Sequence, residues 1–422
     1  MKRCSAWLVA AGSAALILTA AGKEGVAVPA AAADRAGDWC QWLTGSPGTV
    51  YSNPANPWLQ ELKFFNTFQV NWAWVDGASD GDDFWYSNRG EIRRFWPGVS
   101  AKLAGGALTA HYEMMLEDDE HPSDGKRHLS YDSNWAAYLE WELTKTFPNL
   151  GGAGSWSIGY GKRYLPLVEE VVDPARLMPV VERSALSNRL FILTTNGSAP
   201  LGAWVRHKAG RWSSFAGIYS TDTAPHWGNW DAGLDFIVQT ERDIADWTGT
   251  DSALMAFALY YDDTERGDDR MLTDVNWAAS AWTVIAEGPW TWRANVVYGE
   301  ADSTLAARDG RFWGFVGTAQ YWLLEDRLEA VARYHYQGAE NREGIRLYSR
   351  YARIAGAAAN EDIDLLAGGY GDQQHALYLG LNWLLCGHQL KLMAGVELEQ
   401  LKSGSTEVYE GLTYWLGLRH FF

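Results

Sequence analysis

The chain ends in VYEGLTYWLGLRHFF, residues 408–422, and this stretch decides the fold. One face of the stretch is apolar and carries Leu412, Tyr414, Leu416, Leu418 and Phe422. The opposite face carries Thr413, Trp415, Gly417 and Arg419. Such alternation with a period of two predicts a β-strand with one apolar side. A chain that stops on an apolar strand with a terminal aromatic is typical of transmembrane barrels, because the last strand then pairs with the first and leaves no edge facing lipid.

The composition supports a barrel. The 422 residues include 24 Trp, 20 Tyr and 14 Phe, as expected where aromatic girdles lie at both membrane interfaces. A secreted Trp-rich carbohydrate-binding sandwich is the alternative class with so much tryptophan. The formal net charge of −17 argues against nucleic acid as a partner, because binding phosphates needs a basic surface.

The N-terminus has the pattern of a secretory leader. Lys2 and Arg3 precede an apolar stretch at residues 6–21, and small residues follow at 31–33. No later run reaches the ~18 apolar residues of a membrane-spanning helix. We therefore expect a signal peptide at 1–33, a periplasmic lead-in at 34–60 and a transmembrane barrel at 61–422, in the outer membrane of a Gram-negative-type bacterium.

Short and long connections alternate along the chain, which predicts an all-β, antiparallel barrel of about 16 strands, with roughly 14 or 18 as alternatives. The first strand is expected at 61–75 and the second acidic loop at 117–133. In the fourth strand, Trp135, Leu139 and Trp141 are expected on one face, with Glu140 and Glu142 on the other.

Alternation places a mixed set of charges on the inward face. The basic ones are Lys63, Arg94, Lys102, Arg293, Arg333, Lys391 and Arg419. The acidic ones are Glu113, Glu140, Glu142, Glu329, Glu397 and Glu399. Each basic side chain either serves transport or forms a salt bridge with the lumen wall.

Catalytic and metal-binding patterns are missing from the sequence. It has no G-x-S-x-G, no H-E-x-x-H, no Walker or Rossmann glycine pattern and no paired C-x-x-C. We expect no catalytic residues, no metal and no cofactor.

Several segments together resemble the phosphate-selective porin O/P family. They are NPWLQELK at 56–63, EIRRF at 91–95, VERSALSN at 181–188, ARY at 332–334, LGLNW at 379–383 and GHQLKL at 387–392. The resemblance implies a 16-stranded barrel, commonly a trimer, whose long third loop folds into the lumen as the constriction. It also implies that inward Arg and Lys hold anions such as phosphate. In this chain the loop carries Arg183 and Glu182, and we expect Arg183 near the narrowest point.

The expected function is passive diffusion of small hydrophilic solutes across the outer membrane. The pore-lining and constriction residues are expected to be Arg94, Lys102, Arg183, Arg293, Arg333, Lys391, Arg419 and Glu182. The partners are then small solutes, with phosphate as a candidate, together with membrane lipid and two further copies in a homotrimer. The rivals are a membrane-embedded barrel enzyme and the secreted sugar-binding protein.

Two cysteines follow the expected leader, Cys40 and Cys386. Loop parity puts both on the periplasmic side, roughly 10–15 Å apart at the usual strand spacing. Either they form a disulfide, which an oxidising compartment would preserve, or they are two unpaired thiols.

Overall fold

The computed structural model describes residues 38–422, apart from 80–81, 89, 121–126, 153, 173–174, 192–198, 223, 232, 267, 269, 273, 348 and 353–368. The expected leader at 1–33 and the first residues of the expected lead-in lie outside the described residues.

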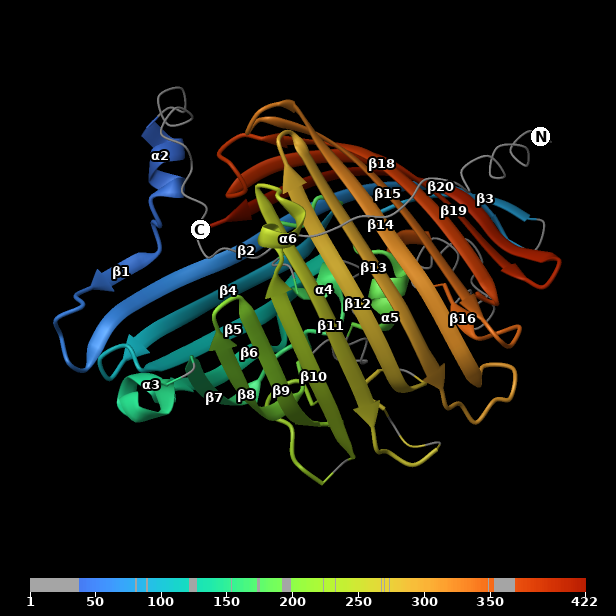
Figure 1. The fold of residues 1–422 in the computed structure, drawn as a ribbon. Helices are drawn as coiled ribbons and strands as arrows, with labels where there is room; N and C mark the ends of the chain where they lie inside the picture. The colour runs from blue at the N-terminus through green and yellow to red at the C-terminus, as the bar shows by residue number, and fades with distance from the viewer. Residues whose placement is uncertain are drawn as a thin grey trace.

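Within the described residues, sixteen antiparallel strands close into one barrel, which confirms the expected fold (Figure 1). The strands are β2 (Leu59–Ser79), β4 (Glu91–Leu103), β5 (Leu108–Glu120), β6 (Arg127–Glu142), β7 (Ser155–Lys162), β8 (Leu201–Ala209), β9 (Trp212–Ser220), β10 (Leu234–Asp243), β11 (Ser252–Asp262), β12 (Val275–Glu287), β13 (Trp290–Ala301), β14 (Gly310–Leu324), β15 (Leu328–Ala339), β18 (Gln373–Leu384), β19 (Leu390–Ser403) and β20 (Thr406–Phe421).

The last strand closes the barrel against the first. β20 pairs antiparallel with β2, from Thr67 opposite Phe421 to Ser79 opposite Tyr409. Beyond the end of β20, the short strand β1 (Thr49–Ser52) pairs with residues 61–63 of β2. At the other end of β2, β3 (Asp82–Ser87) pairs with residues 74–79. The two short strands therefore cover the backbone of β2 where its long neighbours do not reach.

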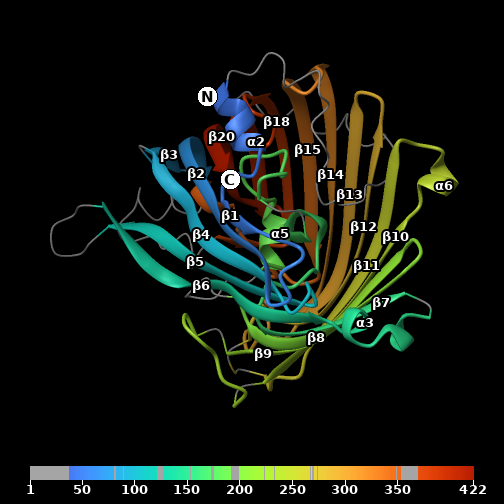
Figure 2. The same cartoon turned by 90° about the vertical axis from the view of Figure 1, so that its left-hand side faces the viewer.

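Short turns lie at one end of the barrel and long loops at the other. The short-turn end carries α3 (Leu143–Thr146), the 3-10 helix η1 (Pro148–Gly151) and α6 (Ala245–Thr248). Helix α2 (Asp38–Thr44) lies close to the C-terminus at this same end (Figure 2). The connection between β15 and β18 at the long-loop end holds a separate pair of strands, β16 (Ile345–Arg346) and β17 (Tyr370–Gly371).

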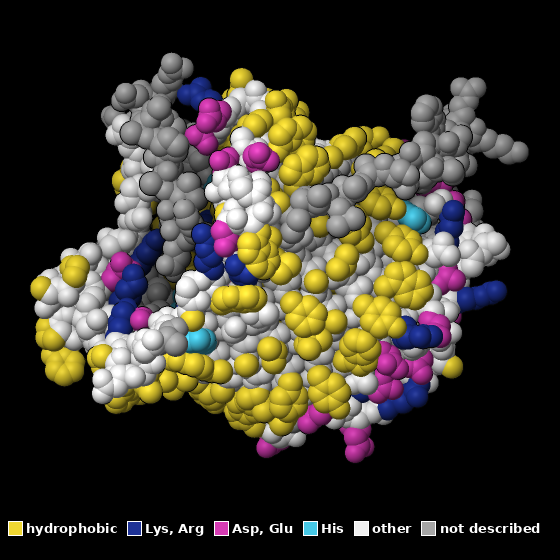
Figure 3. Space-filling view, in the orientation of Figure 1, with side chains coloured by type: hydrophobic (Ala, Val, Ile, Leu, Met, Phe, Trp, Pro, Cys, Tyr) yellow, Lys and Arg dark blue, Asp and Glu magenta, His cyan; other side chains and the backbone are white. Residues whose placement is uncertain are grey.

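Apolar side chains cover the outside of the barrel. Leu139, Val238, Val296 and Leu381 are each about half exposed, as side chains that face lipid must be. Figure 3 shows this apolar band across the face formed by β10–β14, with charged side chains gathered beyond it at both ends. None of the described helices has the length and apolar character that a membrane span requires.

Two details of the strand pattern differ from the expectation. The strands β5 and β6 run on through residues 117–120 and 127–133, so much of the expected acidic loop is strand. Trp135 does not share the outward face of Leu139 and Trp141: it is 5% exposed and stacks on Trp96 with ring centroids 4.4 Å apart. The register of β5 and β6 shifts beside Trp135, and a shift of one residue reverses the side on which a side chain points.

Cys40 and Cys386 form a disulfide, with Cα atoms 5.3 Å apart. The bond joins α2 to the turn between β18 and β19, and both cysteines pack with Leu43 in a small apolar cluster. It therefore ties the N-terminal segment to the barrel one strand away from the closing pair.

Candidate constriction

The connection between β7 and β8, residues 163–200, is called loop 3 below. Its described residues, 163–172, 175–191 and 199–200, lie inside the barrel rather than above it, as expected, and Figure 2 shows helix α5 (Ala185–Arg189) within the ring of strands. One side of loop 3 is apolar: Leu165, Leu167, Val168 and Leu186 are at most 2% exposed. These residues pack on inward side chains from β8 to β14, including Trp204, Phe215, Trp282, Phe312 and Val316.

The other side of loop 3 is held through its backbone. Residues 175–184 are called the strap below. Arg419 of β20 donates hydrogen bonds to the strap carbonyls of Ala175 (2.9 Å), Met178 (3.0 Å), Val180 (2.8 Å) and Val181 (2.7 Å). Lys391 of β19 donates to Met178 (2.8 Å), and Asn382 of β18 donates to Pro179 (2.7 Å). These bonds hold the backbone of the strap in place. The strap has no regular secondary structure, so its carbonyls need such side-chain donors.

Glu182 connects the strap to β4. Its carboxylate lies 2.8 Å from Arg93 and 3.5 Å from Arg94, and it accepts a hydrogen bond from Asn71 at 2.9 Å. Burial alone would raise the pKa of Glu182, but the charges of Arg93 and Arg94 outweigh burial and hold the pKa well below its ordinary value. Glu182 is therefore a buried carboxylate that stays charged.

A register shift explains how two adjacent arginines reach one carboxylate. Gln69 pairs with Arg94, and the next residue of β2 pairs with Ile92, so Arg93 has no partner in the ladder. An extra residue of this kind turns a side chain that strict alternation would direct outward. For that reason strict alternation selects Arg94 and passes over Arg93.

Glu170, in helix α4 (Glu169–Val172), holds a second ionic centre. It pairs with Arg333 at 2.8 Å and accepts hydrogen bonds from the backbone N (2.8 Å) and Oγ (2.6 Å) of Ser184. Burial by itself raises the pKa of Glu170; the charge of Arg333 and the Ser184 hydrogen bonds outweigh it and lower the pKa to about 2. Arg333 also bonds Glu397 and the Glu182 carbonyl, each at 2.8 Å.

The remaining expected site residues lie in different surroundings. Arg183 donates to the Glu170 carbonyl at 2.9 Å and lies over the ring of Phe191, and burial lowers its pKa to about 10. Arg293 pairs with Glu169 and bonds Gln320. Lys102 is 52% exposed at the short-turn end and pairs with Glu61 at 3.1 Å.

The structure therefore brings together Arg94, Arg183, Arg333, Lys391, Arg419 and Glu182 around the strap, leaves Arg293 beside helix α4 and leaves Lys102 at the rim. The group formed by Arg94, Arg333, Lys391 and Arg419 is called the arginine wall below; each member is at most 1% exposed. Their role in a conducting pore stays a prediction. Glu170 and Asn382 were missed, because alternation along strands cannot rank loop residues or neutral side chains.

A second polar group lines the barrel at β5–β8. Glu140 of β6 lies 3.3 Å from Arg163 and 3.7 Å from Arg206, and it accepts a hydrogen bond from Trp204 Nε1 at 2.9 Å. His111 and Glu113 of β5 face each other at 3.7 Å. These five charged or titratable side chains, called the β5–β8 wall below, are each 13–28% exposed.

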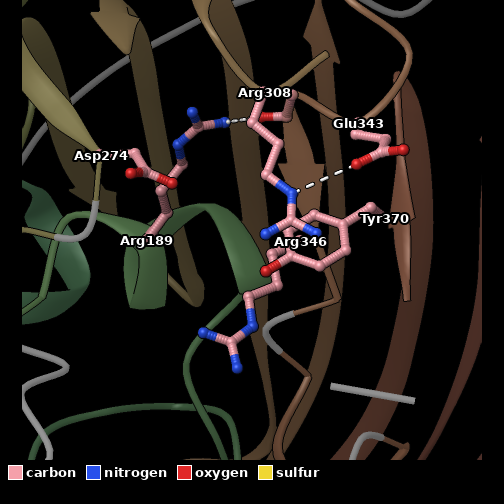
Figure 4. A pocket seen from close by; sticks show the side chains of 7 residues that line it. Arg189, Asp274, Arg308, Glu343, Arg346 and Tyr370 are labelled. Carbon is pink, nitrogen blue, oxygen red and sulfur yellow. Dashed lines mark hydrogen bonds and ion pairs between the residues drawn. The ribbon is translucent and has the colours of Figure 1, made fainter. Parts of the chain in front are cut away.

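A small pocket lies where loop 3 meets the outer loops (Figure 4). Arg189 donates to the Gly344 carbonyl at 2.8 Å, and Arg308 pairs with Glu343 at 3.2 Å while lying over the ring of Tyr370. The Arg189 hydrogen bond fastens loop 3 at the long-loop end, and the Arg308 contacts hold the outer loops around it together. Among the described residues, no group of three or more His, Cys, Asp or Glu side chains is arranged to hold a metal ion.

Comparison of the fold identifies its class. The structure matches an anion-selective porin from Comamonas acidovorans with a TM-score of 0.53 and 11% identity, over 86% of this chain and 99% of that one. It matches OprB of Pseudomonas putida with a TM-score of 0.55 and 9% identity, over 85% of this chain and 94% of that one. The chain has the porin fold. No protein-family model matches it, and neither does the sequence of any curated protein.

Nearly the whole length of each of these two porins aligns with this chain, so the similarity extends over the barrel from its first strand to its last. Because the identities are so low, the similarity establishes the fold and leaves the solute to be argued from the residues of the lumen.

Proposed function

We propose that this porin-fold barrel is an outer-membrane channel for passive diffusion of small hydrophilic solutes. The observation that carries the proposal is a closed barrel with an apolar outside, crossed internally by a loop that charged side chains hold in place. A barrel of sixteen strands is wide enough to enclose water, and charges at a narrow crossing select among solutes.

Phosphate is the first anion to test, because the sequence resembles the phosphate-selective O/P family. The ion pairs of the lumen favour a range of solutes broader than phosphate alone. Arg333 is bound to Glu170 and Glu397, and Arg94 to Glu182. Basic side chains that already form ion pairs with protein carboxylates have fewer donors left to bind a phosphate.

The topology that goes with this function has a cleaved signal peptide at 1–33 and a periplasmic lead-in at 34–60. It places the short turns and both ends of the mature chain on the periplasmic side. Three copies of the chain would form a homotrimer. The disulfide supports the periplasmic placement of Cys40 and Cys386, since that compartment is oxidising.

The alternatives fare differently. A secreted sandwich is ruled out as a fold, because a sandwich consists of two open sheets and this barrel is closed. For a barrel enzyme, no arrangement of side chains described above supplies a nucleophile with its base, and the structural neighbours reported above are porins.

The test has two stages. Cell fractionation should place the protein in the outer membrane, and detergent-purified protein in a planar bilayer should then produce stepwise ion conductance. A soluble protein, or an outer-membrane protein that leaves the bilayer silent at all voltages, would contradict the proposal. Size-exclusion chromatography with light scattering measures the number of copies.

A further inference from the structure

We propose that solutes cross the barrel beside the β5–β8 wall rather than along the arginine wall, and that Arg206 sets their charge preference in favour of small anions. This inference rests on the proposed channel function and specifies its path.

The arginine wall is engaged in holding the strap rather than open to solutes. Arg419, Lys391 and Arg333 are at most 1% exposed, and each donates hydrogen bonds to the strap. A solute passing between them would have to replace several hydrogen bonds to buried charges at the same time. Leaving such charges without partners is strongly unfavourable.

The β8–β14 side of the lumen is sealed by apolar packing. Leu165, Leu167 and Val168 pack with Trp282 and Phe312, all of which are at most 2% exposed. A hydrated solute would have to lose its water to enter such a contact, and a polar group without partners there is costly.

The β5–β8 wall differs from both. Its polar side chains keep 13% (Glu113) to 28% (Arg206) exposure, although they face inward. Accessible polar side chains on an inward face are what a water-filled path needs. The residues come from β5, β6 and β8 and from Arg163 at the start of loop 3, so the path would run between loop 3 and this part of the barrel.

Within this wall, Arg206 is the basic group available to a solute. Glu140 is shared: Arg163 and Trp204 bond it at 3.3 Å and 2.9 Å, and Arg206 approaches only to 3.7 Å. Among the described residues, Arg206 has an ion pair at that distance and lies over the Phe215 ring, with no hydrogen bond donated. Around Glu140, two arginines meet one glutamate, which leaves a local excess of positive charge, whereas Glu113 of the same wall lies beside His111. Guanidinium donors fit the oxygens of a carboxylate or a phosphate.

The test combines charge preference with accessibility. In planar bilayers with a KCl gradient, Arg206→Gln should lower the anion-to-cation permeability ratio at least about twofold, and Arg206→Lys should retain it, because a charge at the path sets selectivity. Arg211→Gln, an exposed arginine in the β8–β9 turn, is the matched control and should leave the ratio unchanged. Repeating the measurement with potassium acetate and potassium phosphate separates preference for carboxylate from preference for phosphate.

Cysteine labelling tests the path itself, because Cys40 and Cys386 are already paired. A negatively charged methanethiosulfonate reagent should reduce the conductance of Arg206→Cys by about half or more, as expected for a group that narrows the path. It should leave Thr318→Cys unaffected, because Thr318 is 6% exposed and lies between Arg293 and Arg333 in the sheet. Blocking at Thr318→Cys without effect at Arg206→Cys would overturn the inferred path while leaving the channel function intact. A wild-type protein that conducts no ions would overturn both.

Discussion

At the scale of single residues, loop 3 depends on two carboxylates. Glu170 and Glu182 are each at most 6% exposed, yet their arginine partners outweigh the unfavourable burial and keep both charged. A buried pair contributes little net stability compared with an apolar replacement, but removing one partner leaves the other charge uncompensated. The loop is therefore most sensitive to changes at one side of each pair.

Glu182→Gln should destabilise the folded barrel by about 3 kcal/mol, because Arg93 and Arg94 then share no carboxylate. Thermal unfolding in detergent, followed by circular dichroism, measures the loss. Glu343→Gln is the matched control: this glutamate pairs with Arg308 but is 44% exposed, so its change should stay within about 1 kcal/mol. Equal melting temperatures for the two variants would show that the Glu182 pair does not hold the loop.

Glu170 should make the attachment of loop 3 sensitive to strong acid. Its folded pKa of about 2 lies below the ordinary value of 4.5, so its stabilisation is complete above about pH 4.5 and is lost as the pH falls toward 2. The Ser184 amide donates a hydrogen bond to Glu170, so its protection against exchange, relative to the intrinsic rate at each pH, should fall over this range in the wild type. In Glu170→Gln the exchange should already be fast at neutral pH, and this pH dependence should be absent.

At the scale of the element, loop 3 is attached by two kinds of contact. Apolar packing against β8–β14 depends on side-chain volume, whereas the strap depends on donors that reach its carbonyls. The second kind tolerates changes in the strap's own side chains, because the accepting atoms belong to the backbone. It does not tolerate changes in the donors, above all Arg419.

Arg419→Met should free the strap while leaving the apolar side of loop 3 in place. The variant removes donors to the carbonyls of Ala175, Met178, Val180 and Val181, so exchange of strap amides should rise at least about tenfold through local opening. Conductance per channel should increase, since a mobile strap obstructs less of the lumen. Arg311→Met, at an exposed pair with Glu340, should change neither quantity. Unchanged exchange in Arg419→Met would refute the role of Arg419 in holding the strap.

At the scale of the whole molecule, strand pairing and a disulfide both act near the closure of the barrel. The main chain closes it through β20 and β2, and the disulfide fastens α2 to the β18–β19 turn. The two cysteines are 346 residues apart in the sequence. Reducing the bond therefore increases the conformational entropy of the unfolded chain considerably. Strand pairing, rather than the disulfide, defines the barrel, because β20 pairs with β2 along its length.

Reduction should lower stability without opening the barrel. We expect a loss of about 2–4 kcal/mol, seen as a lower melting temperature in a reducing buffer. The double variant Cys40→Ser, Cys386→Ser should melt at that lower temperature whether or not reductant is present. Mass spectrometry of the unreduced, denatured protein should find no alkylatable thiol at either position; two alkylated cysteines would show that the bond does not form.

The resemblance to the O/P porin family indicated the third loop as the internal segment. The pattern of the sequence by itself determined the barrel and its closure. Alternation in residues 408–422 and the order of short and long connections sufficed, because a strand's period of two and the rule that lipid meets no open edge act locally along the chain. The same alternation correctly directed Arg94, Arg333 and Arg419 inward.

Only the tertiary structure decided which inward residues meet each other. Register shifts brought Arg93 inward beside Arg94 and buried Trp135 against Trp96, and no local pattern announces such a shift. The pairing of Glu170 with Arg333 joins residues 163 positions apart, and the donors to the strap recognise backbone carbonyls that every sequence has. The burial of the arginine wall and the partial exposure of the β5–β8 wall follow from where loop 3 lies across the lumen, which is a property of the closed barrel rather than of any one strand.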